Sequence, residues 1–238
     1  MNDINQQVDL FFDRFEEVMK NDGFCDYYRD GLLYRNGNET QIWNDSKYKI
    51  CILLKEPPQS YDAREYYKVN SNFGHRIAAW VSGINLLDSG DSLSSSFESV
   101  YSKTKESRNL REYGFQNNAL ALVNLKKTKG GSNAVNSEIV NIVNKYSLQI
   151  KEELDILKPN IIICGGSLVF NLAINNIFNN LEYEKIIADK LFYFKSKKMI
   201  LINNYHPSAR TSNKDIYESV LDSFLYFKTS KYISEILK

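Results

Sequence analysis

Three side chains that can do chemistry stand on one short segment near the C-terminal end of the chain. Residues 203–210 read Asn-Asn-Tyr-His-Pro-Ser-Ala-Arg and follow directly on an apolar run at residues 199–202. A proline cannot extend a β-ladder, so we expect a strand to end here and to present His206 at the edge of a sheet. A neutral imidazole there can donate a hydrogen bond to negative charge that develops on a leaving group. A histidine that only caps the loop is the alternative interpretation.

A carboxylate stands in the same context far upstream. Glu56 follows the apolar run at residues 49–54 and precedes Pro57 and Pro58. Two prolines stiffen the loop, so the carboxylate leaves the strand with little conformational freedom. In that position it can orient a water molecule or stabilise a developing positive charge. A loop carboxylate exposed to solvent, without such a role, is the alternative.

Four apolar runs of strand length must position these groups. The runs lie at residues 49–54, 119–123, 161–164 and 199–202. Continuous apolar runs are typical of parallel strands buried on both faces, and parallel sheets place their chemistry at the carboxyl edge. We therefore expect one rim of the sheet to carry Glu56, Asn124, Ser167 and His206.

Segments with helical periodicity alternate with these runs, as at residues 3–20, 133–157 and 215–237. This order predicts an α/β fold, a three-layer α/β/α sandwich around a mainly parallel, four-stranded central sheet. We expect a single domain over residues 1–238. Residues 1–45 are expected to form a helical and hairpin extension packed on it, with the hairpin turn at Asn36-Gly37.

The composition limits the possible classes of protein. With 238 residues, of which 43% are hydrophobic, the chain can bury a full core. No signal-peptide pattern and no membrane-spanning run is visible, so we expect a cytoplasmic protein without a membrane partner. The scattered Cys25, Cys51 and Cys164 predict neither a metal site nor a cluster. The net charge of +1 means that binding to nucleic acid must rely on a local basic patch.

Five segments, taken in order, resemble motifs of the uracil-DNA glycosylase superfamily, from about Lys49 to Arg210. The acidic loop, the uracil-reading asparagine at the end of the next strand, and the His-Pro-Ser loop are the main elements of that pattern. The segments are Lys55-Glu56-Pro57-Pro58-Gln59, Asn72-Phe73-Gly74-His75-Arg76-Ile77-Ala78, Leu122-Val123-Asn124-Leu125-Lys126, residues 157–167 with Gly165-Gly166-Ser167, and His206-Pro207-Ser208.

The resemblance implies a monomeric DNA glycosylase that flips a base out of single- or double-stranded DNA and hydrolyses its N-glycosidic bond without a cofactor. It implies Glu56 and His206 as catalytic residues, the first acting on water or the cationic sugar and the second on the departing base. It implies Phe73, Asn124 and Pro58 as the base-binding residues. The residues implied to hold DNA phosphates or the duplex are Ser167, Ser208, Arg210, Lys126 and Lys127.

The chain also departs from the family pattern. It lacks the four cysteines of the iron–sulfur branch, and it has lost both glycines of the first motif. Pro58 stands where another branch has a tyrosine that excludes 5-substituted pyrimidines. Loss of that gate would admit a bulkier modified base, as expected of an enzyme acting against foreign modified DNA. Tyr61 is the first candidate for a replacement gate.

Other interpretations remain open at this stage. Asn124 can equally form an Asx turn after its strand, and Ser167 can act as a helix N-cap. For the whole chain, the alternative to a glycosylase is a catalytically silent superfamily member that binds nucleic acid or a protein. A nucleotide hydrolase is a third candidate, against which the absence of a Gly-rich phosphate-binding loop with Lys-Ser/Thr argues.

Overall fold

The computed structural model describes residues 3–33, 37–57, 62–68, 72–90, 93–106, 118–131 and 134–236. Its α-helices are α1 (Ile4–Asn21), α2 (Glu39–Asp45), α3 (Asn72–Asp88), α4 (Phe97–Glu106), α6 (Asn136–Leu157), α7 (Ser167–Leu172), α8 (Asn213–Lys228) and α9 (Ile233–Ile236). Short 3-10 or π turns lie at Ala63–Lys68, Ala173–Ile177 and Lys195–Lys197. The strands are β1 (Gly31–Leu32), β2 (Ile50–Leu54), β3 (Leu120–Asn124), β4 (Ile161–Gly165), β5 (Glu184–Ile187), β6 (Leu191–Phe194) and β7 (Met199–Asn204).

All described strands form one mixed sheet in the order β1-β3-β2-β4-β7-β6-β5. The four central strands β3, β2, β4 and β7 are parallel. β1 and the β5–β6 pair extend the sheet on its two sides through antiparallel pairing. Every residue of the parallel strands β2, β3 and β4 is buried, which explains why these strands read as continuous apolar runs.

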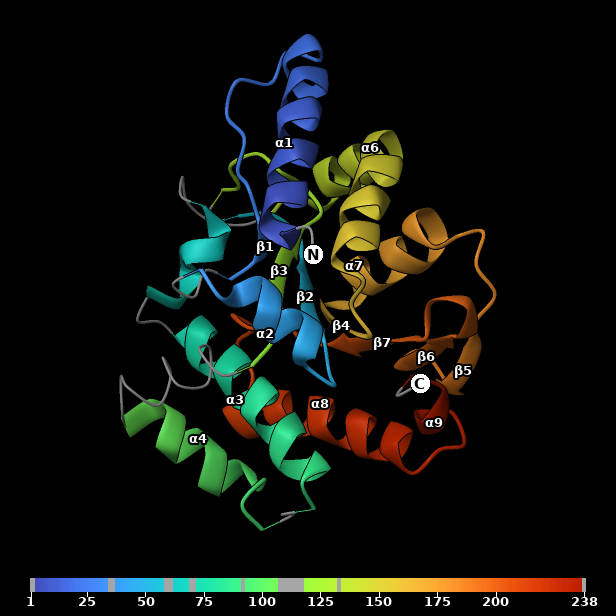
Figure 1. The fold of residues 1–238 in the computed structure, drawn as a ribbon. Coiled ribbons are helices and arrows are strands. Elements are labelled where there is room, and N and C mark those ends of the chain that lie inside the picture. The colour runs from blue at the N-terminus through green and yellow to red at the C-terminus, as the bar shows by residue number, and fades with distance from the viewer. Residues whose placement is uncertain are drawn as a thin grey trace.

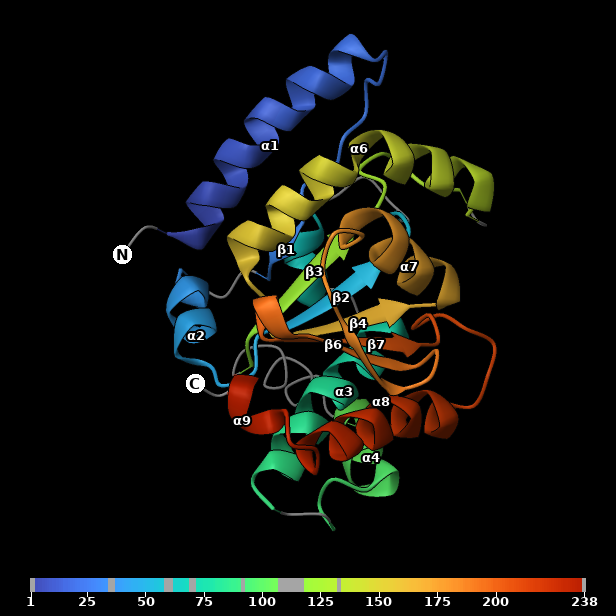
Figure 2. The same ribbon diagram turned by 90° about the vertical axis from the view of Figure 1, so that its right-hand side faces the viewer.

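Helices cover both faces of the sheet, as Figures 1 and 2 show. Alternate side chains of β2 point to opposite faces, so that Cys51 and Leu53 pack on one side while Ile50 and Ile52 pack on the other. The first face carries α1, α6 and α7, and the second carries α3, α4, α8 and α9. No helix of the described part of the chain is long and apolar enough to cross a bilayer.

The α/β class and the four predicted parallel strands are confirmed, and so is the helix over residues 3–20. The expected count of four strands is wrong, because the described residues already form a sheet of seven. β1 is only two residues long, too short to give a hydrophobic pattern of its own. The hairpin expected around residues 31–43 is also wrong: β1 pairs with β3, and residues Glu39–Asp45 form α2. The last parallel strand, β7, is preceded by β6, and the two pair antiparallel.

Candidate functional site

The carboxyl ends of the parallel strands bring the candidate residues to one edge of the sheet. Leu54 pairs with Asn124, and Gly165 pairs with Asn204, two residues before His206. The chain leaves β4 toward α7 on one face and leaves β7 toward α8 on the other. Connections that part in opposite directions open a crevice between the strand ends, which is where α/β proteins commonly bind ligands.

His206 is held in a defined orientation and protonation state. Its Nδ1 accepts a hydrogen bond from the backbone N–H of Ser208 at 3.1 Å. That nitrogen must then carry the lone pair, so the proton sits on Nε2 as a donor. Among the described residues Nε2 has no hydrogen-bond partner. Burial, and to a smaller extent the charge of Lys55, lowers the pKa of His206 to about 4, so the imidazole is neutral at pH 7.

Two neighbours fix the position of the His206 ring. Gly165 lies beneath it, where an added Cβ would stand 3.3 Å from Cδ2 of His206 and 2.8 Å from Cδ2 of Leu54. Phe73, from the start of α3, places its ring centroid 5.9 Å from the imidazole, tilted by 52°. Phe73, which the resemblance implies as a base-binding residue, therefore lies beside His206.

Arg76 of α3 holds the segment that follows β7. Its guanidinium donates hydrogen bonds to the carbonyl oxygens of Pro207 (2.6 Å), Ala209 (2.9 Å) and Thr211 (3.3 Å), and to Oδ1 of Asn213 (2.7 Å). Four contacts from one planar group restrain the whole loop from His206 to the start of α8. Sequence reasoning noted Arg76 only as part of a motif and gave it no role.

A cavity of about 340 Å³ adjoins His206 between the ends of β4 and β7. Residues from the start of α7, from β7 and the loop after it, from α8 and from the β5–β6 turn meet there. Its lining consists of Gly166, Ser167, Asp189, Lys190, Asn203, Asn204, Tyr205, His206 and Ser219. Glu56 and Asn124 do not line this cavity, so the expectation that they share a pocket with His206 stays a prediction.

Glu56 is at the expected edge but is already paired. Its side chain is only 7% exposed, and its Oε2 lies 3.0 Å from Nζ of Lys126. Gly130 covers the carboxyl group so closely that a Cβ at this position would approach it to 2.4 Å. Lys126 also contacts Glu138 at 3.2 Å. Two carboxylates therefore neutralise Lys126 in the free protein, and its contact with a DNA phosphate stays a prediction.

Asn124 belongs to a buried polar network. Its backbone N–H and its Nδ2 donate to Oδ2 of Asp30 at 2.6 and 3.1 Å. Oδ1 of Asp30 accepts from Lys127 at 2.6 Å, and Lys127 also reaches Glu153 at 2.5 Å. Burial raises the pKa of Glu153 well above its usual range, with Asp30 adding to the effect. The expectation that Lys127 contacts DNA is wrong, because its side chain is 1% exposed.

The remaining predicted residues lie at the same edge or outside the described residues. Ser208 and Arg210 are exposed on the loop after β7, and Ser167 is exposed at the start of α7. The hydroxyl of Ser167 accepts a long contact of 3.5 Å from Nδ2 of Asn203. Pro58 and Tyr61, on which the expectations about a gate rest, lie outside the described residues.

Two residues of this edge were missed. Asn204 ends β7 and lines the cavity, and its position directly before Tyr205-His206 was a usable signal, since it parallels the position of Asn124 at the end of β3. Asp30 holds Asn124, yet it precedes a strand of only two residues. No sequence pattern pointed to it.

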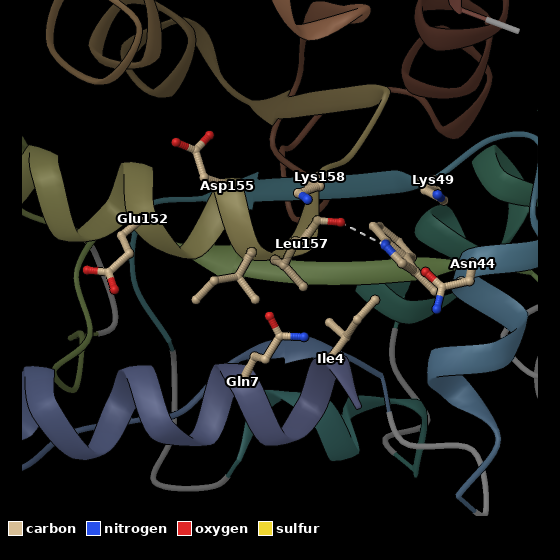
Figure 3. A pocket seen from close by; sticks show the side chains of 10 residues that line it. Ile4, Gln7, Asn44, Lys49, Glu152, Asp155, Leu157 and Lys158 are labelled. Carbon is tan, nitrogen blue, oxygen red and sulfur yellow. Dashed lines mark hydrogen bonds between the residues drawn. The ribbon is translucent and has the colours of Figure 1, made fainter. Parts of the chain in front are cut away.

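A larger cavity, of about 540 Å³, lies near the opposite edge of the sheet between α1, α2 and the end of α6 (Figure 3). Its acidic residues are already paired: Glu152 contacts Arg14, and Asp155 contacts Lys151 and Lys197. It contains no histidine, so it offers no group comparable with His206.

Within the described ranges, no three His, Cys, Asp or Glu side chains are arranged to hold a metal ion. A comparison with protein-family models and with curated proteins found no match. Fold and site together define an α/β protein with a mixed seven-stranded sheet and a neutral, oriented imidazole beside a cavity at the carboxyl edge.

Proposed function

We propose that this protein is a DNA glycosylase-like enzyme that hydrolyses the N-glycosidic bond of uracil or another altered base after the base has been flipped out. The observation that carries the proposal is the state of His206: its Nδ1 is occupied by Ser208 N–H, and its Nε2–H is available beside a cavity. Breaking an N-glycosidic bond leaves negative charge on the departing base, and a fixed donor stabilises that charge without reorganisation.

The surroundings of His206 support the same chemistry. Phe73 places an aromatic ring next to the imidazole, and a base that enters between strand ends needs such a surface to replace lost stacking. The cavity of about 340 Å³ has room for a single base. Glu56 lies at the same edge, and its pairing with Lys126 positions the carboxylate. A gate at Pro58 or Tyr61 would decide which bases can enter. Without such a gate the enzyme would accept bulkier modified bases, and the proposed role against foreign modified DNA depends on that.

The test is abasic-site formation on oligonucleotides that each carry one uracil or one 5-substituted pyrimidine, in the presence of a chelator. We expect cleavage of at least one substrate by the wild type. His206→Ala should slow it by about 100-fold or more, the loss typical for one transition-state donor. Leu148→Ala, which truncates an exposed side chain of α6, serves as the control. If the wild type leaves all substrates intact, or if His206→Ala is as active, the proposal is wrong.

The alternative function is binding of nucleic acid without catalysis. It is favoured by the pairing of Glu56 with Lys126 and of Asn124 with Asp30. Both groups are engaged within the protein, as expected of a silent member that binds nucleic acid without cleaving it. If the wild type binds the same oligonucleotides without forming any abasic product, and His206→Ala binds them equally well, the protein is a nucleic-acid-binding protein rather than an enzyme.

A further inference from the structure

The cavity of about 540 Å³ lies at the edge where the parallel strands begin, here called the amino edge, and its wall contains two lysines without a partner. Lys49 stands directly before β2, and Lys158 follows α6. Neither ammonium group has an ion pair or a hydrogen bond among the described residues. Figure 3 shows the two lysines along one rim of the cavity, across from Ile4 and Gln7 of α1. The proposed function makes no use of this site.

Neighbouring strands hold the two lysine-bearing segments together. β2 and β4 pair in parallel, with Ile50 opposite Ile161. Asn160 joins the starts of these strands, because its Oδ1 accepts from the N–H of Lys49 at 2.8 Å and its own N–H donates to the Lys49 carbonyl oxygen at 3.1 Å. Lys158 precedes Asn160 by two residues. The segments that carry the lysines are therefore fixed relative to each other.

The backbone at Lys158 is in the left-handed region, with a φ of 51°. Glycine adopts this conformation at the end of a helix with the least strain, so a lysine there is strained. Lys198, directly before β7, has the same conformation with a φ of 47° and does not line the cavity. The two positions form a matched pair, because glycine can replace either lysine without disturbing the backbone.

Positive charge exceeds negative charge around this cavity. The lining includes two carboxylates, and each already has a cation. Glu152 contacts Arg14 at 2.6 Å. Asp155 contacts Lys151 at 2.8 Å and Lys197 at 2.7 Å. The two unpaired lysines of the rim add to these cations, so that a ligand in the cavity meets an excess of positive charge.

The end of α6 does not cancel this excess. A helix C-terminus carries partial negative charge on its last carbonyl groups and would repel an anion. Here the carbonyl oxygen of Leu157 accepts from Nε1 of Trp43 at 2.8 Å, drawn as the dashed line in Figure 3. The carbonyl oxygen of Leu154 accepts from the N–H of Lys158 at 2.8 Å. Two of the terminal carbonyls are thus occupied by donors of the protein itself.

The remaining wall suits an organic molecule better than a bare ion. Ile4, Ile156 and Leu157 contribute apolar side chains, and Gln7 contributes a carboxamide. The volume of about 540 Å³ falls within the range of small-molecule sites, about 300–1,000 Å³, and far exceeds what one phosphate group needs.

We propose that this cavity binds a phosphate monoester whose organic part has the size of a nucleoside, as in a nucleoside monophosphate. A monoester carries a charge of about −1.5 to −2 at pH 7, which two ammonium groups can balance. Lysine binds phosphate as a point charge on a flexible stem. The phosphoryl group binds at Lys49 and Lys158, and the organic part lies against Ile4 and Ile156 with a polar edge at Gln7.

The two tryptophans of the chain provide a probe and its internal control. The indole N–H of Trp43 donates to Leu157 in the cavity wall, whereas that of Trp80 donates to Ile216 on the other face of the sheet. Their NMR signals are followed in the wild-type protein while adenosine monophosphate is added up to millimolar concentration. We expect the Trp43 signal to shift until it saturates and the Trp80 signal to stay in place. No shift at Trp43, or equal shifts at both, would overturn the proposal.

Three further probes test the parts of the ligand. Adenosine lacks the phosphate, whereas ribose 5-phosphate and inorganic phosphate lack the base. We expect each to bind more weakly than adenosine monophosphate by about tenfold or more, the effect of losing one set of contacts. Equal affinity for adenosine would overturn the phosphate site. Equal affinity for ribose 5-phosphate or for inorganic phosphate would overturn the assignment of a nucleoside-sized organic part.

The matched glycine variants separate the site from general surface charge. Lys158→Gly removes one cation and suits the left-handed backbone, so it should fold about as stably as the wild type. We expect it to weaken binding of adenosine monophosphate about tenfold, the loss of one charged contact. Lys198→Gly makes the same change outside the cavity and should bind as the wild type does. Equal weakening in the two variants, or unchanged binding in Lys158→Gly, would overturn the site.

Two more variants complete the test. Lys49→Gln should weaken binding as much as Lys158→Gly does, because both lysines hold the same phosphoryl group; unchanged binding would contradict this assignment. His206→Ala, at the opposite edge of the sheet, should bind adenosine monophosphate as the wild type does. Loss of binding in His206→Ala would place the nucleotide in the cavity beside His206 and overturn the proposal. The outcome at the amino edge does not depend on whether the protein cleaves DNA.

Discussion

His206 shows how the surroundings set the chemistry of a single residue. Its Nδ1 is occupied by a backbone N–H, its ring rests on Gly165, and burial lowers its pKa to about 4. A donor that needs no proton uptake acts at any pH above this value. The same features make the residue sensitive to acid, because protonation would place a hydrogen on Nδ1 against the N–H of Ser208.

A first prediction concerns stability in acid. The pKa of His206 is about 4 in the folded protein and about 6.5 in an unfolded chain, so the unfolded chain binds more protons between these values. The contribution of His206 to stability is therefore complete above about pH 6.5 and falls as the pH decreases toward 4. Urea denaturation at pH 7 and pH 4.5 measures it. His206→Asn should lose less stability over this interval than the wild type; an equal loss would show that His206 does not titrate in this way.

At the scale of the elements, the contact between α3 and the loop after β7 is what keeps His206 in place. Arg76→Gln should disconnect three backbone carbonyls and cost roughly 2 kcal/mol of unfolding free energy. Looser packing of the loop should also expose the imidazole, so that its NMR titration midpoint rises from about 4 toward 6.5. Arg76→Lys keeps the charge but loses the planar guanidinium. Its unfolding free energy and its His206 titration midpoint should therefore lie between those of Arg76→Gln and the wild type. An unchanged midpoint in Arg76→Gln would contradict the positioning role.

The buried network makes a second prediction at this scale, because it joins the segment before β1, the segment after β3 and α6. Lys127→Met leaves the carboxylate of Asp30 buried without its cation and should cost about 3–5 kcal/mol. Adding Asp30→Asn removes the stranded charge and should recover part of the loss. Lys129→Met, at an exposed lysine two residues along, is the matched control. Chemical denaturation measures all three variants, and a neutral Lys127→Met would show that the network is not ionised.

These elements also show what the sequence can predict. Continuous apolar runs identified β2, β3, β4 and β7, because strands buried on both faces leave that pattern. Strand ends then placed Glu56, Asn124 and His206 at one edge. The burial of Lys127 could not be predicted, since its partners Asp30 and Glu153 lie 97 and 26 residues away in the chain. A lysine beside a glycine-bearing loop has the same local pattern whether it is exposed or buried.

At the scale of the whole molecule, the net charge of +1 means that basic and acidic side chains nearly balance. Two of the three basic residues expected to contact DNA are paired with carboxylates, namely Lys126 and Lys127. Arg210 is exposed on the loop after His206 and has no ion pair among the described residues. The electrostatic contribution to any DNA binding should therefore be small and should depend on Arg210.

The last prediction tests this distribution through the dependence of DNA binding on salt. Each phosphate neutralised on duplex DNA contributes about −0.9 to the slope of log K against log salt concentration. Arg210→Gln should reduce the magnitude of the slope by about that amount, because one exposed cation is lost at the candidate edge. Lys126→Gln should leave the slope unchanged, because Glu56 and Glu138 already neutralise this lysine in the free protein. Titrations of a labelled duplex at several salt concentrations give the slopes. If Lys126→Gln reduces the slope as much as Arg210→Gln does, Lys126 must exchange its carboxylate partners for phosphate on binding, and the ion pair with Glu56 would then open whenever DNA is bound.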